Sequence, residues 1–245
     1  MKKTKLWLLI AAAMILLGGI LFTAVMCLLH WDFTRLSTFS YETREYTLTE
    51  TYTDIFVDTN TADVTLLPAS DGMTRVVCYE QENLLHSVSV QENTLTVQLH
   101  DSRKWYQHMG VNFATPKITV YLPTDTLETI CVKVSTGKLE LADITCKNFT
   151  TTGSTGKVSL KNLIATEKME LRRSTGDVAL DGCDGAEIIV KTGTGDITGT
   201  LLSQKTFTAQ TDTGRISVPQ STTGGPCTLT TSTGNIEIEC KMQNA

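Results

Sequence analysis

The dipeptide Thr-Gly recurs at a nearly constant interval through the second half of the sequence. Consecutive glycines of this repeat are 19 or 20 residues apart. An internal period of this length predicts an array of small units that stack on one another, because one unit cannot bury its own apolar face. The glycines are Gly137, Gly156, Gly176, Gly195, Gly214 and Gly234.

Apolar and polar residues alternate on both sides of each glycine. Around Gly176, apolar residues stand seven and five positions before it (Met169, Leu171) and two and four positions after it (Val178, Leu180). Alternation is typical of a strand with one buried face. Each unit is therefore predicted to contain two short strands that meet at a Ser-Thr-Gly corner. Glycine suits such a corner because it adopts positive φ without a Cβ clash.

Two all-β arrangements fit this pattern. One is a β-solenoid, similar to a parallel β-helix, in which each coil turns once and stacks on the coil before it. The other is a sandwich or roll of hairpins with the same spacing. We expect the solenoid, because equivalent residues recur at a fixed period. The repeats cover 129–240, and 51–128 is predicted to form irregular N-terminal coils, with Ala62 at the glycine position of one copy and a hairpin across 88–99.

An apolar segment precedes the β region. From Leu6 to Leu29 no residue is charged, and lysines stand just before this segment but not just after it. A helix of that length spans a bilayer, and the lysines place its N-terminus in the cytoplasm. We therefore expect a cytoplasmic tail at 1–5, a transmembrane helix at 6–30, a juxtamembrane stalk at 31–50 and an extracytoplasmic domain after it. A cleaved signal peptide or a lipoprotein signal at Cys27 is the alternative, but the apolar segment is long for either.

Charge and cysteine spacing exclude several classes of function. The net charge is −5, and setting aside the three lysines before the apolar segment leaves −8. An acidic domain has no general attraction for nucleic acid or anionic lipid. No two of the seven cysteines form a C-x-x-C pair, so neither a zinc nor a redox site is predicted. We expect most of them to be free thiols, some of them buried as small hydrophobes.

The sequence predicts no catalytic residue, no metal ligand and no cofactor, so we expect a protein that is not an enzyme. Neither a G-x-S-x-G elbow nor a phosphate-binding loop is present. Residues directly after the repeat glycines mix cations with Asp177 and Asp196, which disfavours a calcium ladder.

Three segments together resemble a known family. They are the Ser-Thr-Gly-Asp-Val unit at 174–178, the strand at 118–123 and the Thr-Ala-Asp-Val unit at 61–64. They resemble the bacterial "putative adhesin" family of β-strand-repeat domains of unknown function, over about residues 50–240. The resemblance implies a right-handed β-solenoid-like fold at the cell surface, often fused to a membrane helix. It also implies a link to envelope-stress and antimicrobial-peptide responses, and it carries over no catalytic residues.

Two surfaces are candidate binding sites. The loop at 100–116 is rich in aromatic and basic residues, which suits a binding surface, although the same residues suit a cap over the open end of a solenoid. Its candidate residues are Arg103, Lys104, Trp105, Tyr106, His108 and Phe113. A row of threonines lies at the corners, from Thr136 to Thr233, with the neighbours Thr152, Thr192, Thr211 and Thr231. It is either a hydroxyl surface for glycan, peptidoglycan or ice, or a device that stacks the coils and keeps the edge soluble.

These observations predict a non-enzymatic module on the cell membrane that binds an envelope component or senses envelope stress. Its partner would be a membrane protein or a cell-wall glycan. The alternative hypothesis is a structural or adhesive surface protein whose repeats form a rigid spacer.

Overall fold

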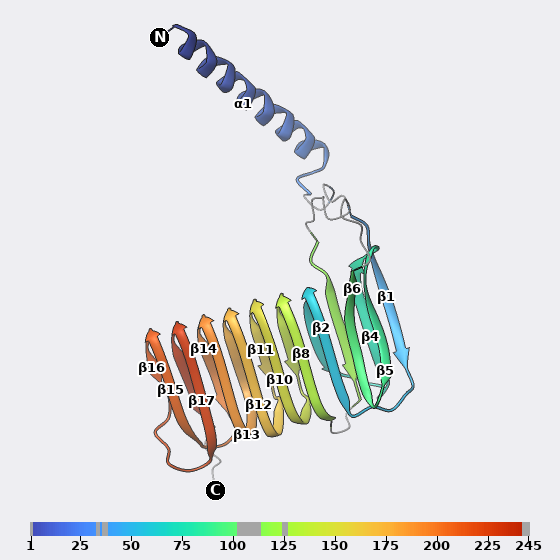
Figure 1. The fold of residues 1–245 in the computed structure, drawn as a ribbon, viewed down its shortest axis with the longest axis vertical. Helices are drawn as coiled ribbons and strands as arrows, with labels where there is room; N and C mark the ends of the chain where they lie inside the picture. The colour runs from blue at the N-terminus through green and yellow to red at the C-terminus, as the bar shows by residue number, and fades with distance from the viewer. Residues whose placement is uncertain (1, 33–34, 36–38, 102–113, 124–126, 242–245) are drawn as a thin grey trace. The chain divides into compact units, whose positions relative to one another are not determined.

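The computed structural model describes residues 2–32, 35, 39–101, 114–123 and 127–241 (Figure 1). Contacts divide the chain into two units. The first covers Met1–Ser40 and Arg103–Ala114, and the second covers Tyr41–Ser102 and Thr115–Ala245. Among the described residues, the first unit contains the helix and the second contains all the strands.

The helix α1 (Lys2–Leu28) is apolar over nearly its whole length. Its segment Thr4–Leu28 is long and apolar enough to cross a membrane, a test that a signal sequence near the N-terminus also passes. The helix ends at two left-handed residues, His30 (φ 54°) and Trp31 (φ 59°). The N–H of Trp31 donates to the carbonyl of Met26 at 2.8 Å, which satisfies one of the last helical carbonyls.

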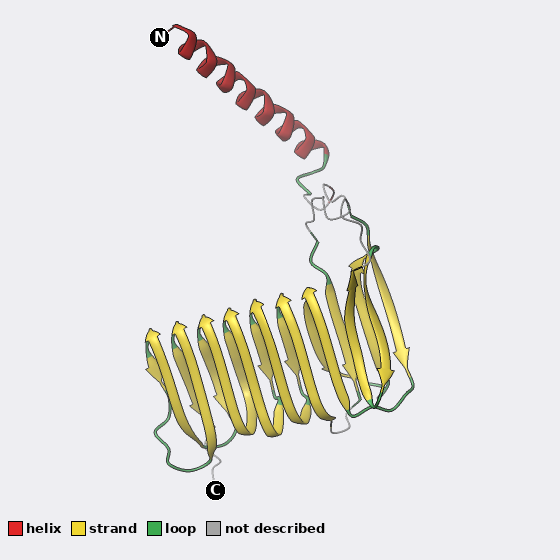
Figure 2. Cartoon of the chain, in the orientation of Figure 1, coloured by secondary structure: helices red, strands yellow, loops and turns green. Residues whose placement is uncertain are grey.

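In the described part of the second unit, 18 strands form one continuous hydrogen-bonded sheet that winds round a core (Figure 2). Neighbouring coils pair in parallel, so the structure is a β-solenoid and not a stack of hairpins. The strands are β1 (Tyr41–Leu48), β2 (Asp54–Thr61), β3 (Asp63–Pro68), β4 (Thr74–Gln81), β5 (Leu84–Gln91), β6 (Thr94–Asp101), β7 (Lys117–Leu122), β8 (Leu127–Thr136), β9 (Leu139–Ala142), β10 (Thr145–Thr155), β11 (Val158–Lys161), β12 (Ile164–Thr175), β13 (Val178–Thr194), β14 (Ile197–Leu201), β15 (Lys205–Thr213), β16 (Ile216–Ser217), β17 (Gly225–Thr233) and β18 (Ile236–Cys240).

The coils present two faces with the core between them. One face runs through β6, β2, β8, β10, β12, the second half of β13, β17 and β15. The other runs through β7, β3, β9, β11, the first half of β13, β14, β18 and β16. Equivalent residues lie side by side: Thr136 pairs with Thr155, and Thr155 with Thr175. Inward columns such as Ile130, Phe149 and Met169 are fully buried.

The order of coils in space differs from their order in sequence at both ends of the stack. The coil β17–β18 lies between β13–β14 and β15–β16. At the other end, β2–β3 lies between β6–β7 and β8–β9. The outermost coil β15–β16 is less buried than the rest: Phe207 is half-buried, and Ile216 is 47% exposed.

Antiparallel strands close the end of the stack that carries β6 and β7. Strand β4 pairs with β7 on one side and β1 on the other, while β5 pairs with β6. The hairpin predicted across 88–99 is confirmed as β5–β6, and its turn residues Glu92 and Asn93 have φ of 46° and 67°. Strand β1 lies within the segment predicted to be a stalk, and β4 follows it in the terminal layer.

Each coil turns at two corners. At the first, all six repeat glycines have positive φ, between 130° and 156°. At the second corner, which the sequence did not reveal, three successive coils place Asp143 (φ 56°), Asn162 (φ 50°) and Gly182 (φ 63°). Asparagine, aspartate and glycine are the residues that tolerate this left-handed region best.

Free, buried cysteines contribute to the core, as the sequence predicted. All seven cysteines are free, and four of them are fully buried: Cys78, Cys146, Cys183 and Cys227. They replace aliphatic side chains in the inward columns and behave there as small hydrophobes.

Candidate functional site

The predicted binding loop, with Arg103, Lys104, Trp105, Tyr106, His108 and Phe113, lies outside the described residues. Within the described residues, polar groups gather at three other places. These are a buried cluster in the closed end of the stack, the hydrogen-bonded corners, and a basic region on one face.

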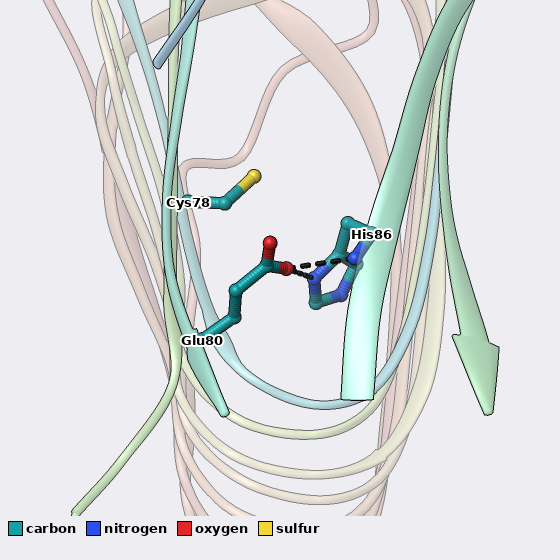
Figure 3. A group of neighbouring side chains, drawn as sticks. All are labelled: Cys78, Glu80 and His86. Atoms are coloured by element: carbon teal, nitrogen blue, oxygen red, sulfur yellow. Dashed lines mark hydrogen bonds and ion pairs between the residues drawn. The ribbon is translucent and has the colours of Figure 1, made fainter. Parts of the chain in front are cut away.

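The buried cluster consists of Cys78 and Glu80 on β4 and His86 on β5 (Figure 3). Residues two apart on a strand share a face, so Cys78 and Glu80 both point toward the core. A short turn then brings His86 opposite them on the inner face of β5. The three residues are 0%, 1% and 4% exposed.

Hydrogen bonds hold the acid and the imidazole of this cluster together. Glu80 Oε2 accepts the backbone N–H of His86 at 2.7 Å and lies 2.7 Å from its Nδ1. The other ring nitrogen, Nε2, lies 3.0 Å from the hydroxyl of Thr59 on β2. The second carboxylate oxygen, Oε1, is buried and has no hydrogen-bond partner. Burial, with a smaller contribution from Glu80, raises the pKa of the Cys78 thiol to about 12.

Sequence reasoning missed this cluster, although part of its signal was present. The Cys-x-Glu spacing within an alternating segment places two ligand-type side chains on one face. The third residue, His86, lies on a different strand, and only the folding of β4 and β5 across the end of the core brings it near. A spacing rule within one strand cannot supply that contact.

The corner threonines bind one coil to the next. The hydroxyl groups of Thr192, Thr211 and Thr231 donate to the carbonyls of repeat glycines in the neighbouring coils, at 3.1, 2.9 and 3.0 Å. These three side chains point inward from their strands. Their geometry favours the stacking interpretation over the ligand-binding interpretation.

Aspartates directly after the repeat glycines, and Asp63 after Ala62 at the equivalent position, have a similar role. Asp63 accepts the backbone N–H of Lys138 at 2.8 Å, and Asp177 accepts that of Asp196 at 3.0 Å. Asp196 in turn accepts the N–H of Asn235 at 2.6 Å. These carboxylates therefore satisfy backbone donors at an exposed corner of the stack.

The third place is centred on β12 and the second half of β13. Arg173 points inward and is 5% exposed, and its Nη1 donates to the carbonyl of Val134 at 2.8 Å. Its Nε and Nη2 are buried and have no hydrogen-bond partner, and burial lowers the pKa of the guanidinium. The adjacent residue Arg172 and the equivalent Lys191 point outward and border a shallow hollow of about 380 Å³.

Charge is distributed unevenly round this hollow. Arg172 is paired with Glu170, with 2.6 Å between Nε and Oε1. Lys191 is exposed and has no ion-pair partner among the described residues. On a chain of net charge −5, this hollow therefore presents an available cation. The remaining lining residues are Thr152, Gly153, Arg173, Ser174, Thr192 and Gly193.

A family model described as Toastrack DUF4097 matches residues 52–245. Among solved structures, a "putative cell adhesion protein" from Clostridium sporogenes is 12% identical, with a TM-score of 0.54 over 82% of this chain and 100% of that one. A "putative adhesin" from Bacteroides fragilis is 18% identical, with a TM-score of 0.39 over 82% and 97% of the two chains. The first likeness shows a shared fold. No curated protein matches the sequence.

Proposed function

Because the chain belongs to the Toastrack DUF4097 family, we propose that it is a non-enzymatic module, anchored in the cell membrane, that binds a component of the cell envelope. The apolar segment Thr4–Leu28 supports the anchor, since it is long enough to span a bilayer. The lysines before it support a cytoplasmic N-terminus and an extracytoplasmic β unit. The solved structure that shares this fold is named a "putative cell adhesion protein", which is consistent with a binding role.

The hollow beside Lys191 is the observation that carries the binding proposal. This hollow suits a ligand rich in hydroxyl and carboxylate groups. Hydrogen bonds can be donated to it by the ammonium group of Lys191, the outward-pointing Arg172 and the hydroxyl groups of Thr152 and Ser174. A cell-wall glycan has this chemistry. The exposed corner serines Ser154, Ser174 and Ser232 would repeat hydroxyl groups along the stack, which suits an extended polymer.

The test measures how much purified full-length protein in detergent is retained by insoluble cell-wall glycan. We expect Lys191→Thr to reduce retention several-fold. Lys157→Thr provides a matched control, because Lys157 is also exposed but lies away from the lining of the hollow. Retention that is absent in the wild-type protein, or equal in both variants, would contradict glycan binding at this site.

The alternative function is a structural or adhesive spacer, which the continuous stacking of rigid coils favours. It predicts no tight ligand and full tolerance of Lys191→Thr.

A second form of the binding hypothesis is a membrane-protein partner, with the loop at 100–116 as the proposed contact. Cross-linking from native membranes tests it by comparing the full-length protein with a variant in which residues 103–113 are replaced by a Gly-Ser linker. Loss of one specific partner would support that contact.

A further inference from the structure

We propose that Cys78, Glu80 and His86 form a binding site for one divalent cation of the zinc class. This site is independent of the proposed envelope ligand, because it lies inside the closed end of the stack. The three residues offer a thiol, a carboxylate and an imidazole, and their ligand atoms all lie within 4.8 Å of one another (Figure 3).

The types of the three ligand atoms and the distances between them favour zinc over other common metal ions. Zinc takes sulfur, nitrogen and oxygen ligands at about 2.0–2.3 Å in a tetrahedron, so neighbouring ligand atoms around it lie roughly 3.3–3.8 Å apart. The three ligand atoms lie within 4.8 Å of one another, so small movements of the side chains would bring them to these separations. A thiol disfavours magnesium and calcium, which prefer ligands made only of oxygen. Three protein ligands leave the fourth position to a water molecule.

The unpartnered oxygen of Glu80 is a second, separate indication of a ligand. A buried carboxylate oxygen without a hydrogen bond is rare, because removing the oxygen from water costs free energy and no new hydrogen bond compensates that cost. Glu80 Oε1 is such an oxygen: it has no hydrogen-bond partner, and Glu80 is only 1% exposed. Figure 3 shows this oxygen on the same side of Glu80 as the thiol of Cys78. A cation between the two groups would satisfy it.

Charge and proton balance also favour a divalent ion. On binding, the S–H bond of Cys78 breaks, its proton passes to water, and a sulfur–metal bond forms. In the metal-free site the Nδ1 proton of neutral His86 bonds to Glu80 Oε2, 2.7 Å away. On metal binding this proton is lost from Nδ1 and one is taken up on Nε2, so that Nδ1 coordinates the ion and Nε2 donates to the hydroxyl of Thr59, 3.0 Å away. Two anionic ligands and one divalent cation sum to zero charge in the buried site. Thr59 would orient the imidazole from behind, as outer partners of metal-bound histidines do.

The test measures metal content and the spectrum of the full-length protein in detergent. After incubation with zinc and removal of excess ion, we expect about one equivalent of zinc per chain. Cobalt in place of zinc should give a sulfur-to-cobalt charge-transfer band in the near ultraviolet. Cys78→Ala should lose both signals, whereas Cys146→Ala, which removes another fully buried thiol elsewhere in the core, should keep them.

Glu80→Gln supplies a second variant that preserves the shape of the side chain, and we expect it to weaken cobalt binding at least tenfold. Circular dichroism and thermal unfolding verify that each variant is folded. The proposal is overturned if the folded wild-type protein retains no zinc. It is equally overturned if folded Cys78→Ala retains as much zinc as the wild type, because the ion would then lie elsewhere.

Discussion

The guanidinium group of Arg173 occupies the space that a side chain at Gly153 would fill. A Cβ placed on Gly153 would lie 1.6 Å from Arg173 Nη1 and 2.0 Å from the carbonyl oxygen of Val134. Gly153 and Arg173 belong to one inward column of the stack. In the later coils this column carries threonines: Thr192, Thr211 and Thr231. Gly153 is therefore required by its neighbours in the stack and not by a left-handed backbone.

The first prediction concerns this contact. Gly153→Ala should lower the free energy of unfolding by about 1–3 kcal/mol, because overpacking in a core forces neighbouring groups apart. Adding Arg173→Met should recover only part of the loss, because the Val134 carbonyl remains in the way. Chemical denaturation of the two single variants and the double variant measures this coupling. Full recovery in the double variant would show that the backbone carbonyl imposes no restriction.

Removing the buried charge alone should have the opposite effect. Arg173→Met keeps most of the side-chain volume and removes two buried nitrogen atoms, Nε and Nη2, that lack hydrogen-bond partners. Replacing a buried charge by a packed apolar side chain is often neutral or stabilising. We expect a free energy of unfolding that is unchanged or raised by about 1 kcal/mol. A loss of more than about 2 kcal/mol in the same denaturation experiment would refute this expectation.

Two glycine variants separate close approach from backbone strain. Gly176 has φ 143°, and a Cβ there would lie 2.2 Å from the carbonyl oxygen of Gly156. Gly72 also has positive φ, 71°, but no atom lies within 4 Å of its Cβ position. Gly72→Ala should therefore cost about 1 kcal/mol, and Gly176→Ala about 2–4 kcal/mol. Equal losses in the two melting curves would show that the stacked carbonyls do not require glycine.

Removing one corner hydroxyl should weaken the stack measurably. Thr231→Val deletes the hydrogen bond to the carbonyl of Gly195 and keeps the shape of the side chain. We expect a loss of about 1 kcal/mol, the usual net value of one buried hydrogen bond. Thr230→Val provides the control, because Thr230 points outward from the same strand. A loss that is no larger for Thr231 than for Thr230 would be inconsistent with a stacking role.

The buried thiols should make the protein sensitive to alkali. Burial raises the pKa of Cys146 and Cys227 from 9.0 to about 12 and that of Cys183 to about 11. Above pH 9 the unfolded chain loses these protons while the folded chain keeps them, so stability present below pH 9 is lost as pH rises through 11–12. Each thiol should contribute about 1.4 kcal/mol per pH unit in this window.

Denaturation from pH 8 to 11, in a reducing buffer with a chelator, measures that slope. Cys146→Ala should reduce the loss of unfolding free energy per pH unit by the contribution of one thiol, whatever the variant's stability at pH 8. Leu160→Val, an equally buried change without a thiol, should leave the slope unchanged. The prediction fails if Cys146→Ala and the wild-type protein lose stability in parallel.

The repeat made much of the fold predictable, because a fixed period and strand alternation express a stacking rule in the sequence itself. Positions such as Val178 and Leu180 are buried as the alternation requires. The second corner was not predicted, because Asp143, Asn162 and Gly182 share no single residue type that a search would align. The closed end was not predicted either, because β1, β4 and β5 lie outside the repeat and pair in the antiparallel direction.

The candidate sites illustrate a different limit. The outward direction of Lys191 follows from alternation alone. By contrast, the approach of His86 to Glu80 depends on two strands that meet across the end of the core. The position of Arg173 depends on Gly153 in the intervening coil, which leaves room for the guanidinium to reach Val134 two coils away. A contact that occurs in only one place, and is not repeated from coil to coil, produces no periodic pattern in a single sequence.

The interleaved coils at the two ends of the stack restrict how such a gene can change its length. A duplicated unit can be inserted among the coils of Gly137, Gly156, Gly176 and Gly195, where order in the chain and order in space agree. Copying the coil of Gly234 onto its own C-terminal side would instead require a strand beside β17, where β13 and β15 already occupy both edges. Growth and shrinkage by whole repeats should therefore be confined to the interior of the array, with the two ends inherited as fixed pieces.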